Sequence, residues 1–186
     1  MSLSEAQNLL RNAQPVLDAQ AASAAVTRVA TEINRTLRNA NPLVLCVMRG
    51  ALVFAGQLLP QLDFPLEVDV LDATRYRNAT QGGAFSLRAL CATPIAGRTV
   101  LLIDDILDEG VTLAALRDHA REAGALRVLT AVFAVKQTGR ATSIIADFMG
   151  VKVPNRYVFG FGMDVHGYWR NLPAVYALNE TLDEHS

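Results

Sequence analysis

The sequence predicts an α/β fold with a largely parallel central sheet flanked by helices. Three short apolar runs, at Leu43–Met48, Thr99–Ile103 and Leu126–Val135, indicate strands that are buried on both faces, as in a parallel sheet. Segments with a helical spacing of apolar residues alternate with these runs, and this alternation is typical of βαβ units. The chain shows neither an internal repeat nor an interdomain linker, so we expect one domain.

Length and composition agree with a single globular domain. The chain has 186 residues, of which 51% are hydrophobic, and 17 basic residues against 18 acidic ones leave a formal net charge of −1. A chain of this length buries a core without disulfides or structural zinc. The apolar content excludes a disordered chain. The balanced charge argues against binding to nucleic acid through bulk charge, so we expect no nucleic-acid partner.

The first 41 residues are expected to be helical. Pro15 separates a short first segment from a longer one. In the longer segment five apolar residues recur every three or four positions and draw one apolar face, namely Ala22, Val26, Val29, Ile33 and Leu37. Pro42 ends this segment, and the strand at Leu43–Met48 follows.

The remaining elements follow from apolar spacing and from turn residues. A helix is expected at Ala51–Gln61, after the first strand, and another at Thr112–Ala123, where Gly124 is placed to close it. The polar segment Thr74–Gly83 indicates a hairpin or a mobile loop. The further strands that we expect are Leu66–Leu71, Ala84–Leu90, Ile144–Phe148 and Tyr157–Phe161.

The cysteines and the hydropathy point to a cytoplasmic protein. Cys46 and Cys91 lie 45 positions apart, and Cys46 sits in an apolar run where a buried, unreactive thiol is expected. This usage favours a reducing compartment. Glu5 and Arg11 interrupt any apolar segment of a signal peptide. No apolar run approaches the roughly 18 residues that a membrane span needs, so no membrane association is expected.

The stretch from Val100 to Leu113 carries the clearest chemical signal. An apolar strand ends in two adjacent carboxylates, Asp104 and Asp105, and a short loop containing Gly110 leads into a helix. Ligands bind beyond the carboxyl ends of parallel strands, and a helix N-terminus suits a phosphate. Carboxylates suit sugar hydroxyls or Mg²⁺. The plainer interpretation is a solvated strand end followed by a turn at Asp108, because turns collect Asp and Gly.

This stretch resembles the phosphoribosyl pyrophosphate (PRPP) binding motif of the type I phosphoribosyltransferases, which is two acidic residues, two apolar ones and Asp-Thr/Ser-Gly-x-Thr after an apolar strand. Other segments resemble the hypoxanthine-guanine branch of that family, in family order from about Leu43 to Asn179. They are Leu45–Gly50, Arg75-Tyr76, Val135-Lys136, Val153–Asp164 and Arg170–Pro173. The C-terminal segments make the resemblance specific for enzymes that act on 6-oxopurines.

The resemblance implies the type I phosphoribosyltransferase fold, with a small hood subdomain and a mobile lid loop. One domain over 1–186 would then comprise an N-terminal helical segment (1–41), a core (43–150) and a purine-binding hood with the C-terminal segment (151–186). The implied reaction is purine salvage, in which the 5-phosphoribosyl group of PRPP passes to hypoxanthine or guanine. The products are IMP or GMP and pyrophosphate, the reaction depends on Mg²⁺, and a homodimer or homotetramer is implied.

The resemblance also implies which residues bind PRPP. They are Asp104, Asp105, Glu109, Gly110, Val111, Thr112, Arg49, Gly50, Arg75, Tyr76 and Arg170. Asp104 and Asp105 would hold the ribose hydroxyls together with a Mg²⁺ ion. Gly110, Val111 and Thr112 would cradle the 5′-phosphate, mainly through backbone N–H groups. Positive charge from the first loop and from the C-terminal segment would face the pyrophosphate.

The resemblance assigns the purine to a second set of residues, of which only Asp108 belongs to the PRPP motif. Asp108 would sit near the purine N7 and accept its proton, so it is the candidate general base. Lys136 would donate a hydrogen bond to the purine O6, the backbone of Val158 would meet N1–H, and Tyr157 would stack on the ring. Asp164 lies in the same segment as the purine contacts and would bind a second Mg²⁺.

Three positions depart from the family pattern. Glu109 replaces a Thr or Ser of the phosphate loop, so either its side chain faces solvent and only its backbone serves the phosphate, or affinity for PRPP is weakened. We favour the first, because backbone N–H groups hold an anion by themselves. Arg75 replaces a Ser or Thr of the lid, where an arginine suits pyrophosphate. Arg49 replaces a lysine, which keeps the charge and changes its geometry.

Three other functions compete with this hypothesis. A regulator on the same fold would sense PRPP or nucleotides and bind RNA or DNA, but it should show a basic face, and the arginines here are dispersed. An enzyme of the same class with a preference for xanthine or guanine is the second alternative. A nucleotide-binding protein without turnover is the third, if Glu109 disrupts the phosphate loop.

Overall fold

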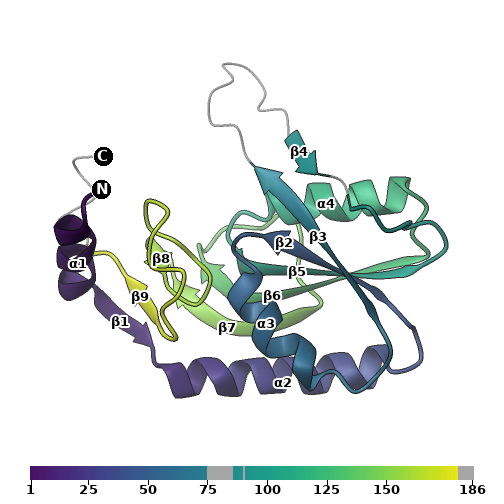
Figure 1. Cartoon of the computed structure of the whole chain (residues 1–186), viewed down its shortest axis with the longest axis horizontal. Coiled ribbons are helices and arrows are strands. Elements are labelled where there is room, and N and C mark those ends of the chain that lie inside the picture. The colour runs from purple at the N-terminus through teal and green to yellow at the C-terminus, as the bar shows by residue number, and fades with distance from the viewer. Residues whose placement is uncertain (75–85, 90, 180–186) are drawn as a thin grey trace.

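Six strands form the central sheet of the protein, for which the computed structural model describes residues 1–74, 86–89 and 91–179 (Figure 1). The strand order is β4-β3-β2-β5-β6-β7. The bounds are β2 Leu43–Met48, β3 Glu67–Thr74, β4 Ser86–Ala89, β5 Thr99–Leu107, β6 Arg127–Gln137 and β7 Phe148–Pro154. β4 runs antiparallel to β3, and every other neighbouring pair is parallel, which confirms the predicted sheet.

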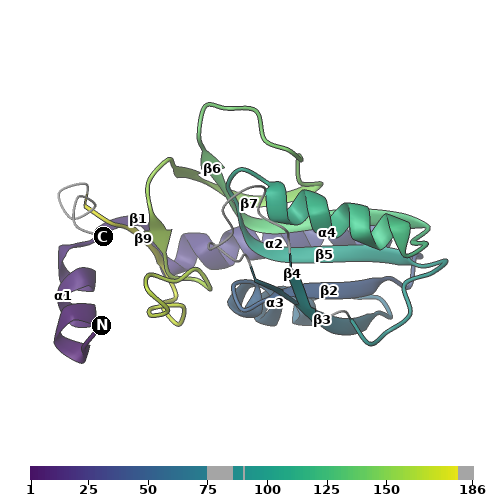
Figure 2. The ribbon, with the colours of Figure 1, turned by 90° about the horizontal axis from the view of Figure 1, so that it is seen from above.

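Helices cover both faces of this sheet (Figure 2). They are α2 Ala19–Leu37, α3 Leu52–Leu58 with the 3₁₀ turn η1 Leu59–Gln61, and α4 Val111–Glu122, whereas α1 Leu3–Asn12 lies away from this sheet (Figure 1). Along β2, Val44 and Cys46 pack with α2 and α3, whereas Leu43 and Leu45 pack with α4. Because successive side chains of a strand point to opposite faces, a strand between two helical layers needs apolar residues throughout.

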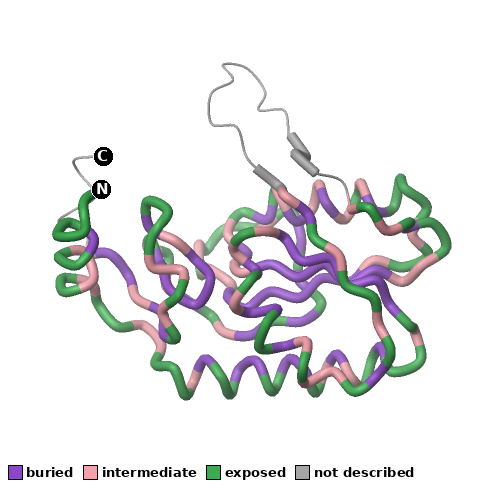
Figure 3. The backbone as a smooth tube through the Cα atoms, in the orientation of Figure 1, coloured by how far each residue is buried: buried purple, intermediate pink, exposed green. Residues whose placement is uncertain are grey.

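Burial follows this layering along the chain. Figure 3 shows buried residues running without a break along the central strands, while α2 alternates between buried and exposed positions. Ala22, Val26, Val29, Ile33 and Leu37 are all buried, as the spacing predicts. Asp18 caps the start of α2 by accepting the N–H of Ala21 at 2.7 Å.

A second, smaller sheet stands beside the core, at the left of Figure 1. Its antiparallel strands, in the order β1-β9-β8, are β1 Gln14–Leu17, β8 Val158–Phe159 and β9 Val175–Ala177. We call this sheet, together with the turn at residues 160–172, the hood. The turn is held by backbone hydrogen bonds, among them those from Phe161 N to Leu172 O and from Gly162 N to Arg170 O, each 2.9 Å long.

The structure corrects three expected elements. The first 41 residues are not helical throughout, because β1 interrupts them, and only its pairing with distant β9 makes Gln14–Leu17 a strand. The expected strand Ile144–Phe148 is wrong, since β7 starts at Phe148 and runs through Gly150, a residue that weakens strand patterns. β8 is limited to two residues of the expected Tyr157–Phe161, since positive φ at Gly160 and Phe161 turns the chain.

Three aromatic residues in contact join the core to the hood, with Phe133 stacked on Phe161 and tilted against Phe54. Phe133 of β6 lies with its ring 4.0 Å from that of Phe161 in the hood turn and 5.8 Å from that of Phe54 in α3, centroid to centroid. All three side chains are buried. Aromatic contacts of this kind add to the free energy gained by burial, so Phe133 helps to fix the hood on the sheet.

We expect Phe133→Ala to lower the free energy of unfolding by about 3 to 5 kcal/mol, because it leaves a cavity between sheet, α3 and hood. Urea denaturation followed by circular dichroism measures this. Leu126→Ala is the control, since that side chain is 78% exposed and its loss should change the free energy by no more than about 0.5 kcal/mol. Equal effects of the two substitutions would contradict the role given to Phe133.

Candidate active site

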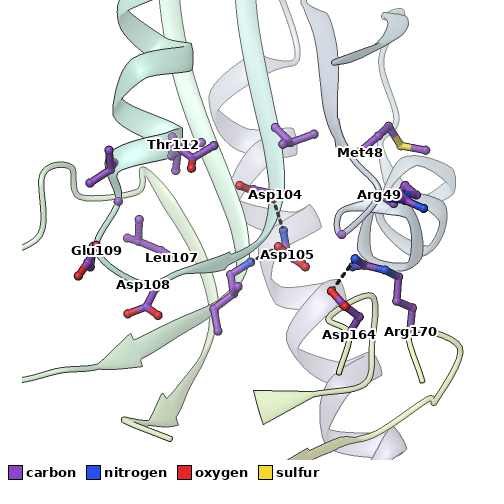
Figure 4. A pocket seen from close by; sticks show the side chains of 16 residues that line it. Met48, Arg49, Asp104, Asp105, Leu107, Asp108, Glu109, Thr112, Asp164 and Arg170 are labelled. Atoms are coloured by element: carbon purple, nitrogen blue, oxygen red, sulfur yellow. Dashed lines mark hydrogen bonds and ion pairs between the residues drawn. The ribbon is translucent and has the colours of Figure 1, made fainter. Parts of the chain in front are cut away.

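A cavity of about 300 Å³ opens at the carboxyl ends of the central strands (Figure 4). Three segments line it. The longest, residues 104–113, runs from the end of β5 into the start of α4. Residues 47–50, which we call the first loop, comprise the end of β2 and the start of its connection to α3, and the hood contributes Asp164 and Arg170. Parallel sheets bind ligands at this edge, where loops from several strands converge.

Two carboxylates, the buried Asp104 and the partly buried Asp105, lie at the centre of the cavity (Figure 4). β5 runs on through Asp104 and Asp105 to Leu107, beyond the strand end that the sequence predicts, because it keeps pairing with β6. The N–H of Asp105 donates to Asp104 Oδ1 at 2.9 Å, and that of Ile106 donates to Asp105 Oδ1 at 2.8 Å. Both carboxylates thus stand at the strand edge with little access to solvent.

Burial makes the charges of this pair costly. It raises the pKa of Asp104 well above its usual value, and the neighbouring Asp105 charge raises it further. Burial also raises the pKa of Asp105, while hydrogen bonds and the charge of Arg170 partly oppose that rise. Desolvation and like charge both disfavour the ionised form of a carboxyl group. A cation or hydroxyl groups from a ligand would relieve this cost.

The donor set suits a magnesium ion that arrives with an anionic ligand. Within residues 1–74, 86–89 and 91–179 no three His, Cys, Asp or Glu side chains gather closely enough to hold a metal ion. Mg²⁺ is usually bound by one or two carboxylates, with water and substrate phosphates completing its coordination. Asp104 and Asp105 line one cavity with Asp164, so they offer such a partial set.

The loop between β5 and α4 has a backbone geometry that suits an anion. Gly110 is the N-cap of α4 at φ 79°, and no side chain caps this helix. The first N–H groups of a helix have no intrahelical partner, and together with the dipole they attract a phosphate. A Cβ at Gly110 would lie 3.0 Å from the Ile144 side chain, so glycine also permits close packing here. The Glu109 side chain is exposed, and its carbonyl accepts the N–H of Ser143 at 3.0 Å.

A smaller cavity of about 180 Å³ adjoins the larger one. Lys136, at the end of β6, and Tyr157 and Val158, at the hood, line it. The Lys136 Nζ atom lies 2.6 Å from Asp108 Oδ2 and is only partly exposed. A charged donor and an acceptor therefore stand side by side in this cavity, which Tyr157, 45% exposed, also lines.

Hydrogen bonds within the hood orient the two charged residues that reach the larger cavity. Arg170 Nη2 lies 2.5 Å from Asp164 Oδ1, and the N–H of Gly167 donates to Asp164 Oδ2 at 2.7 Å. Arg170 Nη1 donates to the carbonyl of Gly162 at 2.7 Å. Arg49 is exposed on the first loop, on the same side of the cavity as Arg170 (Figure 4), so two positive charges line that side.

The structure brings together the described residues that the sequence marks for a site. Those at the larger cavity are Arg49, Gly50, Asp104, Asp105, Asp108, Glu109, Gly110, Val111, Thr112, Asp164 and Arg170. Those at the smaller cavity are Lys136, Tyr157, Val158 and again Asp164. Arg75 and Tyr76 lie outside the described residues. Sequence reasoning missed Met163, which lines the smaller cavity; its position beside Asp164 is the signal that would have indicated it.

A parallel sheet that carries an uncapped helix N-terminus, paired carboxylates and an adjoining small cavity at one edge is typical of α/β proteins that bind phosphorylated ligands. A model of the phosphoribosyl transferase domain family matches residues 12–166. Hypoxanthine-guanine-xanthine phosphoribosyltransferase of Tritrichomonas foetus is 34% identical over 160 residues, which cover 84% of this chain and 86% of that protein. The chain belongs to the phosphoribosyltransferase family, in its hypoxanthine-guanine branch.

Two further comparisons agree. Hypoxanthine-guanine phosphoribosyltransferase of Bacillus subtilis is 33% identical over 162 residues, covering 86% of this chain and 89% of that protein. A solved structure of a hypoxanthine-guanine-xanthine phosphoribosyltransferase superposes with a TM-score of 0.82 at 28% identity, over 91% of this chain and 99% of the other. The fold is therefore the type I phosphoribosyltransferase fold that the sequence motifs indicate.

We expect Asp104→Asn to raise the free energy of unfolding of the magnesium-free protein at pH 7.5 by about 1 kcal/mol or more. A raised pKa in the folded state means that stability is present at low pH and is lost as pH rises through that pKa. The gain should therefore shrink toward zero as the pH falls to 4, because the carboxyl is then protonated in the folded state and close to its ordinary pKa of 3.8 in the unfolded state. Thermal melts between pH 4 and 8 measure it.

Asp63→Asn is the control for this substitution, because Asp63 is exposed and its ion pair with Arg38, at 3.0 Å, lies on the surface. Its effect should be below about 1 kcal/mol at every pH. A loss of stability in Asp104→Asn at pH 7.5 would show that the wild-type carboxylate is well solvated or already neutralised.

Proposed function

We propose that the chain catalyses the transfer of the 5-phosphoribosyl group from PRPP to hypoxanthine or guanine, giving IMP or GMP and pyrophosphate in purine salvage. One observation carries the proposal. The larger, phosphate-type cavity and the smaller cavity share Asp105, Asp108 and Asp164. A sugar phosphate in the first and a flat base in the second would therefore meet beside those carboxylates.

The larger cavity would hold PRPP by its three charged or polar parts. The uncapped N-terminus of α4 would receive the 5′-phosphate, with the Thr112 hydroxyl as a further donor. Asp104 and Asp105 would accept hydrogen bonds from the ribose hydroxyls. Arg49 and Arg170, which lie on the same side of the cavity, would both face the pyrophosphate. Glu109 is exposed, which supports the interpretation that only its backbone serves the phosphate.

The same carboxylates would stabilise the charge that develops during transfer. Breaking the bond at the anomeric carbon leaves positive charge on the ribose and negative charge on the departing pyrophosphate. Fixed charges in a site of low dielectric stabilise such a state strongly. Asp104 and Asp105 would serve the ribose, and Arg170, held by Asp164 and the Gly162 carbonyl, would serve the pyrophosphate. Bound Mg²⁺, held by Asp104 and Asp105, would neutralise pyrophosphate charge.

The ion pair of Lys136 and Asp108 supports a 6-oxopurine as the base. A 6-oxopurine carries an acceptor, O6, on its six-membered ring and a proton on N7 of the fused five-membered ring, and the two lie on the same edge of the base. The Lys136 ammonium would donate to O6, and the Asp108 carboxylate would accept the N7 proton as N9 attacks. Adenine would instead present an amino donor to the ammonium. A buried polar group that faces the wrong partner discriminates by roughly 10⁴-fold or more.

Three further features belong to this proposal. We infer Mg²⁺ as the metal, a homodimer or homotetramer as the assembly and the cytoplasm as the compartment. Cys46 and Cys91 are both free thiols, and burial raises the pKa of Cys46 to about 11, which supports a reducing environment. None of the helices in the described ranges has the length and the hydrophobicity of a membrane span.

A turnover assay with PRPP and Mg²⁺ tests the proposed reaction. Hypoxanthine, guanine, xanthine and adenine are offered in parallel, and nucleotide is detected by absorbance and chromatography. We expect product from hypoxanthine or guanine and none from adenine, because of the Lys136 donor. If no base is converted while calorimetry still detects PRPP binding, the protein is a sensor on this fold, and the proposed reaction is wrong.

We expect Asp108→Asn to lower kcat for nucleotide synthesis by about 10²-fold or more, since proton acceptance by a placed side chain contributes 10²- to 10⁴-fold. The KM for PRPP should change little, because asparagine keeps the shape of the loop. Asp118→Asn on the exposed side of α4 is the control and should leave kcat unchanged. An unchanged kcat in Asp108→Asn would remove this residue from proton transfer.

A further inference from the structure

Two glycines bring the backbone of the first loop into direct contact with its neighbours on both sides. A Cβ at Gly50 would overlap the carboxylate of Asp105, and a Cβ at Gly162 would overlap the carbonyl oxygen of Gly50. Both overlaps are closer than real Cβ atoms approach any heavy atom. The first loop is therefore held between a catalytic-site carboxylate and the backbone of the hood turn, with no side chain between them.

The hood side of this contact is fixed from behind. Gly162 N donates to Arg170 O at 2.9 Å, and Arg170 Nη1 donates back to Gly162 O at 2.7 Å. The preceding residue, Phe161, is 1% exposed and stacks on Phe133 in the core. Gly162 has little room to retreat, because its neighbours on both sides are tied. An atom added at Gly162 would therefore displace the Gly50 carbonyl rather than the hood.

We propose that Gly162 is a positioning residue for the pyrophosphate end of the site. The backbone of Gly162 determines the distance between the first loop and Asp105. Because Arg49 belongs to that loop, the same contact determines where Arg49 contacts the ligand. The inference rests on the proposed function, since it assigns the first loop to the pyrophosphate group of PRPP. It goes beyond that function, because it makes the hood, which lines the purine cavity, a support of the pyrophosphate loop as well.

Gly162→Ala compared with Gly167→Ala tests the proposal. Gly162 has φ +100° and Gly167 has φ +85°, so both substitutions carry the penalty of a positive φ within the same turn. Only the first adds a contact, since nothing lies within 4 Å of a Cβ at Gly167. The N–H of Gly167, which Asp164 accepts, survives in the variant. The difference between the two variants therefore isolates the contact with Gly50.

The readouts are the KM for PRPP, the inhibition constant of pyrophosphate and the KM for hypoxanthine, with calorimetry for direct binding of PRPP. We expect Gly162→Ala to raise the first two constants by about tenfold or more, since small misplacements of a binding group have effects of this size or larger. The KM for hypoxanthine should stay within about threefold, and Gly167→Ala should leave all three constants within that limit. Equal constants in the two variants would overturn the proposal.

The outcomes separate this proposal from the proposed reaction. If the wild type converts no base but binds PRPP and pyrophosphate, the reaction fails while the binding comparison still decides the role of Gly162. If the wild type binds neither compound, both proposals are wrong. Should Gly162→Ala fail to fold, a pyrophosphate titration of the ¹⁵N-labelled wild type replaces it: the amide signal of Gly162 should shift and that of Gly167 should not. An unmoved Gly162 signal would overturn the proposal.

Discussion

The burial of β5 on both faces is the constraint on which the rest of the site depends. Helical layers above and below the sheet require apolar side chains along this strand, and the strand continues into Asp104 and Asp105 before it ends. Two carboxylates thus stand where burial disfavours their charge. Around them the fold supplies an uncapped helix N-terminus, a glycine at the first loop and a guanidinium from the hood. The helix N-terminus and the guanidinium provide positive charge near the carboxylates, and the glycine leaves room for the Asp105 side chain.

The hood is the second organising feature, because it is assembled from segments that lie far apart in the chain. β1 follows the first helix, whereas β8 and β9 come after the whole of the central sheet. Arg156 ties these parts, since its Nη1 donates to the Gln14 side chain at 2.6 Å and its Nη2 to the Leu178 carbonyl. These bonds hold the parts of the hood together, and the stacking of Phe161 on Phe133 joins the hood to the sheet. Residues of the hood thereby line both cavities.

The loop between β5 and α4 can contain the acidic residue Glu109 because its suitability for an anion depends on the backbone and not on that side chain. Glu109 would repel a phosphate if its carboxylate faced the ligand, yet its side chain is exposed and its carbonyl accepts the Ser143 N–H. Anion binding by N–H groups at a helix N-terminus depends on backbone geometry, which Gly110 provides through its positive φ. A loop of this kind accepts an acidic side chain at a position that points outward. By contrast, the Asp108–Lys136 pair depends on both side chains.

The sequence by itself determined the α/β class, most strands of the sheet and the polar and charged residues among those that line the two cavities. Those features are encoded locally, by apolar periodicity and by short motifs whose order follows the chain. Only the tertiary structure decided that Gln14–Leu17 is a strand, because its partner β9 lies more than 150 residues away. It also decided the contact of Gly162 with Gly50 and the place where β7 begins. These features depend on contacts between backbone segments that are far apart in the sequence. A glycine has no side chain, so no hydrophobic pattern in the sequence predicts its contacts.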